Sequence, residues 1–121
     1  MPTRARLLLA AVMAAMAVAL TAVAPASAAP TACKSSDLRY SFNPGGPKTF
    51  GVFNLRQTAT TCKVARYVAK EFGRKYESTG KLPKRAGGFA IFGYTSGPQQ
   101  VTIKATAGRK VVRFRYVVAN G

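Results

Sequence analysis

The chain of 121 residues has two cysteines, Cys33 and Cys62, and such a pair allows three kinds of chemistry. A thiol at a helix N-terminus, where Cys62 is expected, has a lowered pKa and can act as a nucleophile. Cys33 also lies where a bacterial lipoprotein carries its lipid, although Pro30 replaces the aliphatic residue usual three positions earlier. In an oxidising compartment the two thiols form the one disulfide they allow. We expect this Cys33–Cys62 bond, which would contribute roughly 3.5 kcal/mol by restricting the unfolded chain.

A row of cations accompanies the second cysteine. Residues 60–78, TTCKVARYVAKEFGRKYES, predict a helix capped by Thr60 or Thr61 and stopped near Gly80. Its apolar stripe is Cys62, Ala65, Val68, Ala69, Phe72 and Tyr76, and the opposite side carries Lys63, Arg66, Lys70 and Arg74. Like charges spaced three or four residues apart destabilise a helix by about 0.2–0.5 kcal/mol per pair. The row is therefore either a face that binds anions or a solvated surface, and both interpretations stay open.

A second set of cations belongs to two strand-like runs, 100–106 and 111–118. If Gly108 and Arg109 form a two-residue turn, the runs pair as a hairpin with one apolar and one cationic face. The predicted apolar pairs are Ala105 with Val112, Ile103 with Phe114 and Val101 with Tyr116. The other face pairs Lys104 with Arg113 and Thr102 with Arg115. The candidate residues for binding a polyanion are thus Lys63, Arg66, Lys70, Arg74, Lys104, Arg113 and Arg115, expected on two opposed faces.

The sequence lacks the residues needed for acid–base catalysis, for a metal site or for a phosphate-binding loop. The chain has no histidine, and its three acids, Asp37, Glu71 and Glu77, are too scattered for a pair of catalytic carboxylates. No cluster of metal ligands and no glycine-rich phosphate loop is present in the sequence. We therefore expect no enzyme activity, no catalytic residue, no metal and no small-molecule cofactor.

The N-terminal segment indicates export. Arg4 and Arg6 precede an uncharged run from Leu7 to Ala24, and the small residues ASA at 26–28 follow, which is the layout of a secretory signal peptide cleaved after Ala28. The alternative is a retained membrane anchor, since 18 apolar residues reach the lower limit for spanning a bilayer. Cleavage would remove two of the 19 basic residues and leave a net charge of about +14. Such a charge attracts polyanions without selecting among them.

The remaining elements predict a single small domain. We expect a signal peptide at 1–28, an irregular N-terminal arm at 29–48 with a turn at NPGGP, and one α+β domain at 49–121. Strands are predicted at 49–55, 88–94, 100–106 and 111–118, with the helix after the first. This order indicates two layers, one helix packed on a four-stranded antiparallel sheet, with the arm tied on by the disulfide. The register of strand 88–94 is left open. FAIF is apolar at both odd and even positions, so alternation does not show which face of this strand is buried.

The pattern TCKVARYVAKEF, followed by GGFAIF, VTIKA and KVVRFRY, resembles a kind of small exported actinobacterial protein. Those proteins have a helix with the motif Thr/Ser-Cys-x-x-Ala-Arg and a terminal β-hairpin. They usually carry further cysteines in two strands, where this chain has Ala90 or Ile91 and Ile103. The resemblance implies the fold and export, and brings no activity with it.

These observations favour a secreted, non-enzymatic cationic protein that binds anionic polymers of the envelope or the extracellular medium. An acidic protein surface is the other partner considered. In that case the chain would be an inhibitor or envelope-assembly module that uses loops at 43–48 or 95–98. A membrane-active cationic toxin is a third interpretation, in which the protein contacts lipid. Sequence-specific recognition of nucleic acid is not expected, because the cations are spread over several faces.

Overall fold

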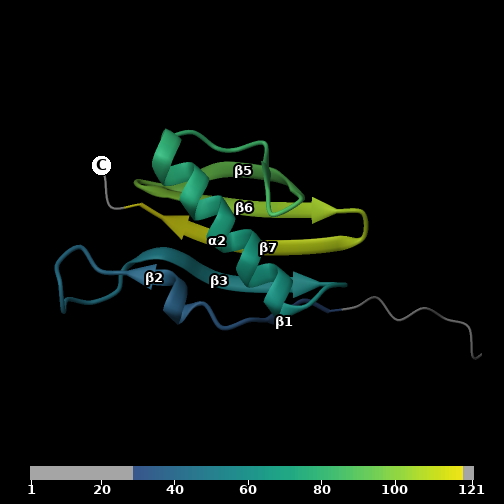
Figure 1. Ribbon diagram of the computed structural model, residues 1–121, viewed down its shortest axis with the longest axis horizontal. Coiled ribbons are helices and arrows are strands. Elements are labelled where there is room, and N and C mark those ends of the chain that lie inside the picture. Colours follow the sequence, from purple (N-terminus) through teal and green to yellow (C-terminus); the bar gives the residue numbers. More distant parts are fainter. Residues whose placement is uncertain (1–28, 119–121) are drawn as a thin grey trace, which may run out of the picture.

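The computed structural model describes residues 29–118, in which one helix packs across one face of a curled antiparallel sheet (Figure 1). This confirms the predicted two-layer α+β architecture. The predicted signal peptide lies outside the described residues. In chain order the elements are β1 (Thr31–Ala32), the 3-10 helix η1 (Ser36–Leu38), β2 (Arg39–Tyr40), β3 (Phe50–Thr58), α2 (Cys62–Thr79), β4 (Arg85–Ala86), β5 (Phe89–Gly97), β6 (Gln100–Ala107) and β7 (Lys110–Val117).

Helix α2 begins and ends close to where the sequence predicts. The side-chain oxygen of Thr61 accepts a hydrogen bond from the backbone N–H of Val64 at 3.2 Å, so Thr61 is the N-cap. At the other end Gly80 adopts a left-handed φ of +69°, and its N–H donates to the Tyr76 carbonyl at 2.8 Å. The buried positions of the helix are Ala65, Val68, Ala69, Phe72 and Gly73.

The four predicted strands form the long part of the sheet in the order β3–β7–β6–β5, so the first of them lies beside the last. The hairpin of β6 and β7 has the predicted register, with every pair from Val101–Tyr116 to Ala105–Val112 in place. Gly108 in its turn has a φ of +62°, which glycine adopts without strain. Three two-residue strands, β1, β2 and β4, extend the sheet beyond the predicted four.

Segment 29–48 contributes to the sheet as well, where the sequence predicts only an irregular arm. β7 covers one edge of β3, and the backbone of the other edge is free to pair. β1 pairs with it through Thr31 opposite Gln57, and β2 through Tyr40 opposite Phe50. The predicted turn at NPGGP is present, because the N–H of Gly46 donates to the Asn43 carbonyl at 2.9 Å.

The predicted disulfide joins Cys33 to Cys62, the first residue of α2. Beside it, the N–H of Cys33 donates to the carbonyl of Leu55 at 2.8 Å. The arm is therefore fixed both to the helix and to β3.

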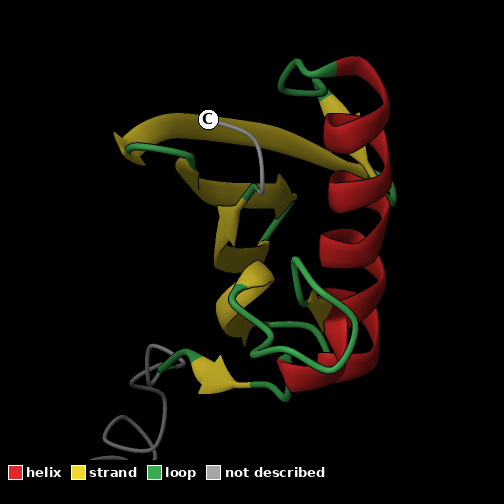
Figure 2. Cartoon of the chain, turned by 90° about the vertical axis from the view of Figure 1, so that its left-hand side faces the viewer, coloured by secondary structure: helices red, strands yellow, loops and turns green. Residues whose placement is uncertain are grey.

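The core lies between α2 and the face of the sheet that the helix covers. The Phe72 ring of the helix meets Phe114 of β7 edge to face at 5.3 Å and Tyr116 at 5.5 Å between centroids. Leu55 of β3 and Ile103 of β6 are fully buried around them. Figure 2 shows that α2 lies on one side of the sheet, so within residues 29–118 the other side, here called the open face, has no helix over it. Within residues 29–118 no helix is long and apolar enough to cross a bilayer.

Candidate functional site

The helix cations are partly neutralised by acids from the same side of the molecule. The guanidinium of Arg66 donates to both carboxylate oxygens of Asp37, at 2.8 and 2.5 Å, and to the carbonyl of Lys34 at 2.8 Å. This hydrogen bond holds the pKa of Asp37 well below its usual range and raises the pKa of Arg66. Arg66 therefore serves to anchor η1 to α2.

Arg74, the last cation of the predicted row, has a similar arrangement. Its guanidinium donates to one carboxylate oxygen of Glu71 at 3.2 and 2.6 Å, and this bond raises the pKa of Arg74. Of the four cations in the row, Lys63 and Lys70 are the two exposed ones without a side-chain partner among residues 29–118. The row is an alternation of paired and free charges, and not a continuous cationic surface.

The third acid also lies on the helix side. Glu77, in the last turn of α2, accepts a hydrogen bond from the hydroxyl of Tyr40. Burial raises the pKa of the neighbouring Tyr116, and the charge of Glu77 adds to the shift. Since the whole chain has three Asp and Glu residues, no acidic side chain remains for the open face of the sheet.

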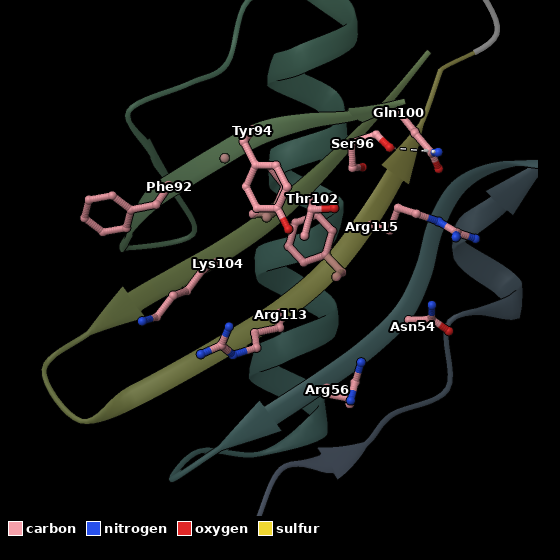
Figure 3. A pocket seen from close by; sticks show the side chains of 13 residues that line it. Asn54, Arg56, Phe92, Tyr94, Ser96, Gln100, Thr102, Lys104, Arg113 and Arg115 are labelled. Atoms are coloured by element: carbon pink, nitrogen blue, oxygen red, sulfur yellow. Dashed lines mark hydrogen bonds between the residues drawn. The ribbon is translucent and has the colours of Figure 1, made fainter. Parts of the chain in front are cut away.

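On the open face, three cations form a row across three neighbouring strands. Arg56 on β3 is opposite Arg113 on β7, which is opposite Lys104 on β6. All three are exposed, and none has a hydrogen bond or an ion pair from its side chain within the described part of the chain. The row ends on β5 at Phe92, which is opposite Lys104 (Figure 3). We call these four residues the first row.

A β-bulge brings Arg56 into the first row. The register of β3 against β7 shifts between Phe53 and Arg56, and Asn54 adopts a φ of +54°. Asparagine tolerates this left-handed conformation better than most residues. The extra residue sends Leu55 into the core, where it is 1% exposed, and turns Arg56 to the open face. Without the bulge, strict alternation would place Arg56 on the core side.

A second row runs parallel to the first, from Phe53 on β3 through Arg115 and Thr102 to Tyr94 on β5. Two guanidinium groups lie within cation–π distance of the Phe53 ring, Arg39 at 4.2 Å and Arg115 at 5.2 Å from its centroid. The Nε of Arg115 is buried and has no hydrogen-bond partner within residues 29–118. Arg115 therefore lies within cation–π distance of Phe53 and has no carboxylate partner among the described residues.

Both rows, apart from Phe53, line a hollow of about 650 Å³ on the open face. Figure 3 shows the cations of β3, β6 and β7 on one part of it and the rings of Phe92 and Tyr94 on another. These rings are 59% and 65% exposed, although large apolar side chains on a strand are normally covered. The hollow thus combines unpaired positive charge with uncovered aromatic surface.

The structure separates the seven predicted site residues into two groups. Lys104, Arg113 and Arg115 come together on the open face, and the four helix residues lie on the opposite side. The sequence did not single out Arg56, Phe92 or Tyr94. Arg56 lies just beyond the predicted strand 49–55, and the bulge that turns it to the open face is recognised only in the pairing of β3 with β7.

Within the described residues no group of three His, Cys, Asp or Glu side chains is placed to hold a metal. Comparison of the chain with protein-family models, curated proteins and solved structures found no match. The functional inference therefore depends on the geometry and charge of the open face.

Proposed function

We propose that this protein is exported and binds anionic polymers of the cell envelope or the extracellular medium through the open face of its sheet, without catalysing a reaction. The observation that carries the proposal is the first row, in which Arg56, Arg113 and Lys104 lie side by side with no acid near them. Like charges directly opposite each other destabilise a sheet. An anionic chain laid across the row would supply the missing counter-charges.

The distribution of the acids supports the choice of this face over the helix. Asp37 and Glu71 offset Arg66 and Arg74 on the helix side, which lowers the positive potential there. The open face keeps its full charge inside a hollow, where low-dielectric walls concentrate the field. The absence of histidine and the engagement of every acid in a bond with another side chain favour binding without catalysis.

Two variants with equal loss of charge test the proposal. One replaces Arg56, Lys104 and Arg113 with Gln. The other replaces Lys63, Lys70 and Lys81 with Gln; these three lysines are also exposed and lie on or near the helix. The probe is polyphosphate, and its affinity is measured over a range of salt concentrations. Each lost contact to a phosphate lowers the salt dependence of log K by about 0.7–0.9, by analogy with nucleic acids.

We expect the open-face variant to reduce the salt dependence by about 2 and the helix-side variant to leave it nearly unchanged. Equal reductions in the two variants would mean attraction to the molecule as a whole and would contradict an open-face site. Absence of any binding by the wild type at low salt would contradict the proposal itself.

One observation favours a second candidate, a module that binds a protein. β4 covers the outer edge of β5 only up to Ala90, with one further hydrogen bond from Ile91 to Lys84, so residues 92–97 have no neighbouring strand on that side within residues 29–118. An extended peptide could add to this edge. The test is a Thr95→Pro variant, which should abolish capture of a peptide partner and leave binding of polyphosphate unchanged.

A further inference from the structure

We propose that the anionic ligand of the open face is a single-stranded nucleic acid, bound without sequence preference, with its phosphates along the cations and its bases stacked on Phe92 and Tyr94. This inference rests on the proposed function, since it identifies the chemistry of the polymer bound at the same face.

Binding of a polyanion through charge alone does not explain why two aromatic side chains are exposed on this face. Phe92 and Tyr94 are separated by one residue of β5, so both project to the open face with about 6.8 Å between their positions along the strand. They are 59% and 65% exposed and line the same hollow as the cations. A ligand carrying charge alone would not use these surfaces, whereas one that also carries flat rings would cover both.

Each ring lies in a cross-strand row that also contains a cation. Phe92 is opposite Lys104 on β6. Tyr94 is opposite Thr102 on β6, which is opposite Arg115 on β7. Across the four long strands the distance is about 14 Å, three times the spacing of neighbouring strands. A single strand lying across the sheet would therefore place its backbone over β7 and β6 and its bases over β5. This combination of a basic groove with aromatic stacking surfaces is how proteins bind single strands without reading sequence.

The identity of the cations favours a nucleic acid over an acidic polysaccharide. Three of the four cations that line the hollow, Arg56, Arg113 and Arg115, are arginines. A guanidinium binds a phosphate through two parallel hydrogen bonds and also stacks on a base. A uronic-acid chain offers carboxylates to the arginines, but it has no planar ring for either the guanidinium groups or the aromatic side chains.

A duplex fits the same surface less well. Its bases are stacked on one another, so Phe92 and Tyr94 would face the sugar-phosphate backbone with their apolar surface unused. Single-stranded chains expose the faces of their bases. We therefore expect the protein to prefer a single strand to a duplex of the same length.

The experiment compares ligands of equal charge. Fluorescence anisotropy is measured with the purified protein and three labelled phosphodiester probes: an oligothymidylate, an abasic chain of the same length, and a duplex of that length. We expect the oligothymidylate to bind about 5–150 times more tightly than the abasic chain for each base that stacks. This comparison needs no variant, so it stays informative even if a substitution disturbs folding.

The matched variants are Phe92→Ser with Tyr94→Ser on the open face, and Tyr67→Ser with Phe42→Ser elsewhere. Tyr67 and Phe42 are 55% and 71% exposed, so the second pair removes a similar amount of aromatic surface. Only the first pair should lower the affinity for the oligothymidylate to that of the abasic chain. Circular dichroism checks that both variants are folded.

Each other result overturns the inference in a recognisable way. Equal affinity for the oligothymidylate and the abasic chain, with the dependence on Arg56, Lys104 and Arg113 retained, would leave polyanion binding in place and refute base stacking. Binding of polygalacturonate with greater affinity than the oligothymidylate would identify an acidic polysaccharide as the ligand. Binding of none of these chains at low salt would refute the proposed function as well.

Discussion

Arg56 on β3 lies directly opposite Arg113 on β7, and neither side chain has an acidic partner within the described chain. Arg113 is also opposite Lys104 on its other side, so one arginine is flanked by two like charges. A sheet gains stability when opposite charges face each other across strands and loses it when like charges do. The open face therefore carries an arrangement that lowers stability in the absence of a ligand.

The first prediction follows from this arrangement. Arg113→Gln should raise the free energy of unfolding by about 0.2–1 kcal/mol, because it removes both repulsions at once. The gain should shrink as salt is added, since screening weakens the repulsion in the wild type. Denaturation by urea at low and high salt measures this. Arg109→Gln in the hairpin turn is the control and should change stability little; an equal gain there would show that net charge alone is responsible.

The second prediction concerns the aromatic centre of the core. Phe72 is fully buried and Phe114 is 3% exposed, with ring centroids 5.3 Å apart. Phe72→Ala or Phe114→Ala should each cost about 3–5 kcal/mol of unfolding free energy. Tyr67→Ala on the exposed side of the helix is the control, with an expected change within about 0.5 kcal/mol. A cost below about 1 kcal/mol at either phenylalanine would contradict the packing described.

The third prediction concerns Gly73, which sits in the middle of α2 against Tyr116. A Cβ atom at this position would lie 2.8 Å from the Tyr116 hydroxyl and 2.9 Å from a ring carbon. Gly→Ala within a helix normally gains up to about 1 kcal/mol. Here overpacking should outweigh that gain, so Gly73→Ala should lower the melting temperature, with a cost of about 1–3 kcal/mol. A rise in the melting temperature would mean that Tyr116 can move aside.

The fourth prediction concerns the disulfide. Cys33 and Cys62 are 29 residues apart and connect the N-terminal arm to the start of α2. Replacing both with Ala should lower the free energy of unfolding by about 2–5 kcal/mol. Reduction of the wild type should give the same loss, and the double variant should not respond to reductant. Free thiols in the protein isolated from an oxidising compartment would contradict the bond.

The fifth prediction is a dependence on pH. Arg66 lowers the pKa of Asp37 in the folded state, whereas in the unfolded chain an aspartate titrates near 3.9. The ion pair therefore contributes its full stability above about pH 4, and loses it as the pH falls from there toward the folded pKa. Asp37→Asn should be less stable than the wild type above pH 4, and the difference should narrow in acid. Arg66→Gln should behave similarly. If the free energy of unfolding of all three proteins changed with pH in parallel, the coupling of Asp37 to Arg66 would be refuted.

The fold could largely be predicted from the sequence, because its signals are local and mutually consistent. The helix stripe, the cap at Thr61 and the stop at Gly80 fix α2, and the alternation of apolar residues around Gly108 fixes the hairpin of β6 and β7. The register of β5 could not be obtained, since Phe89, Ala90, Ile91 and Phe92 are all apolar. Burial of Phe89 and exposure of Phe92 are decided by pairing with β6, which is a tertiary event.

The candidate site could be predicted only in part for the same reason. Three of its cations, Lys104, Arg113 and Arg115, could be predicted because apolar and polar residues alternate along the β6–β7 hairpin, which is a local pattern. Arg56 required the bulge at Asn54, and the bulge is recognised only once β3 is known to pair with β7. The neutralisation of Arg66 depends on Asp37, 29 residues earlier in the chain, and no pattern in the helix itself indicates it.

The placement of the carboxylates has a further physical consequence. None of the three acids offsets a first-row cation, because each of them bonds to another side chain on the helix side. The hollow therefore keeps its positive potential, and a polyanion that meets the open face in a diffusional encounter is attracted into it. A variant that moves one acid from the helix side to the open face, with the net charge unchanged, should lower the association rate constant.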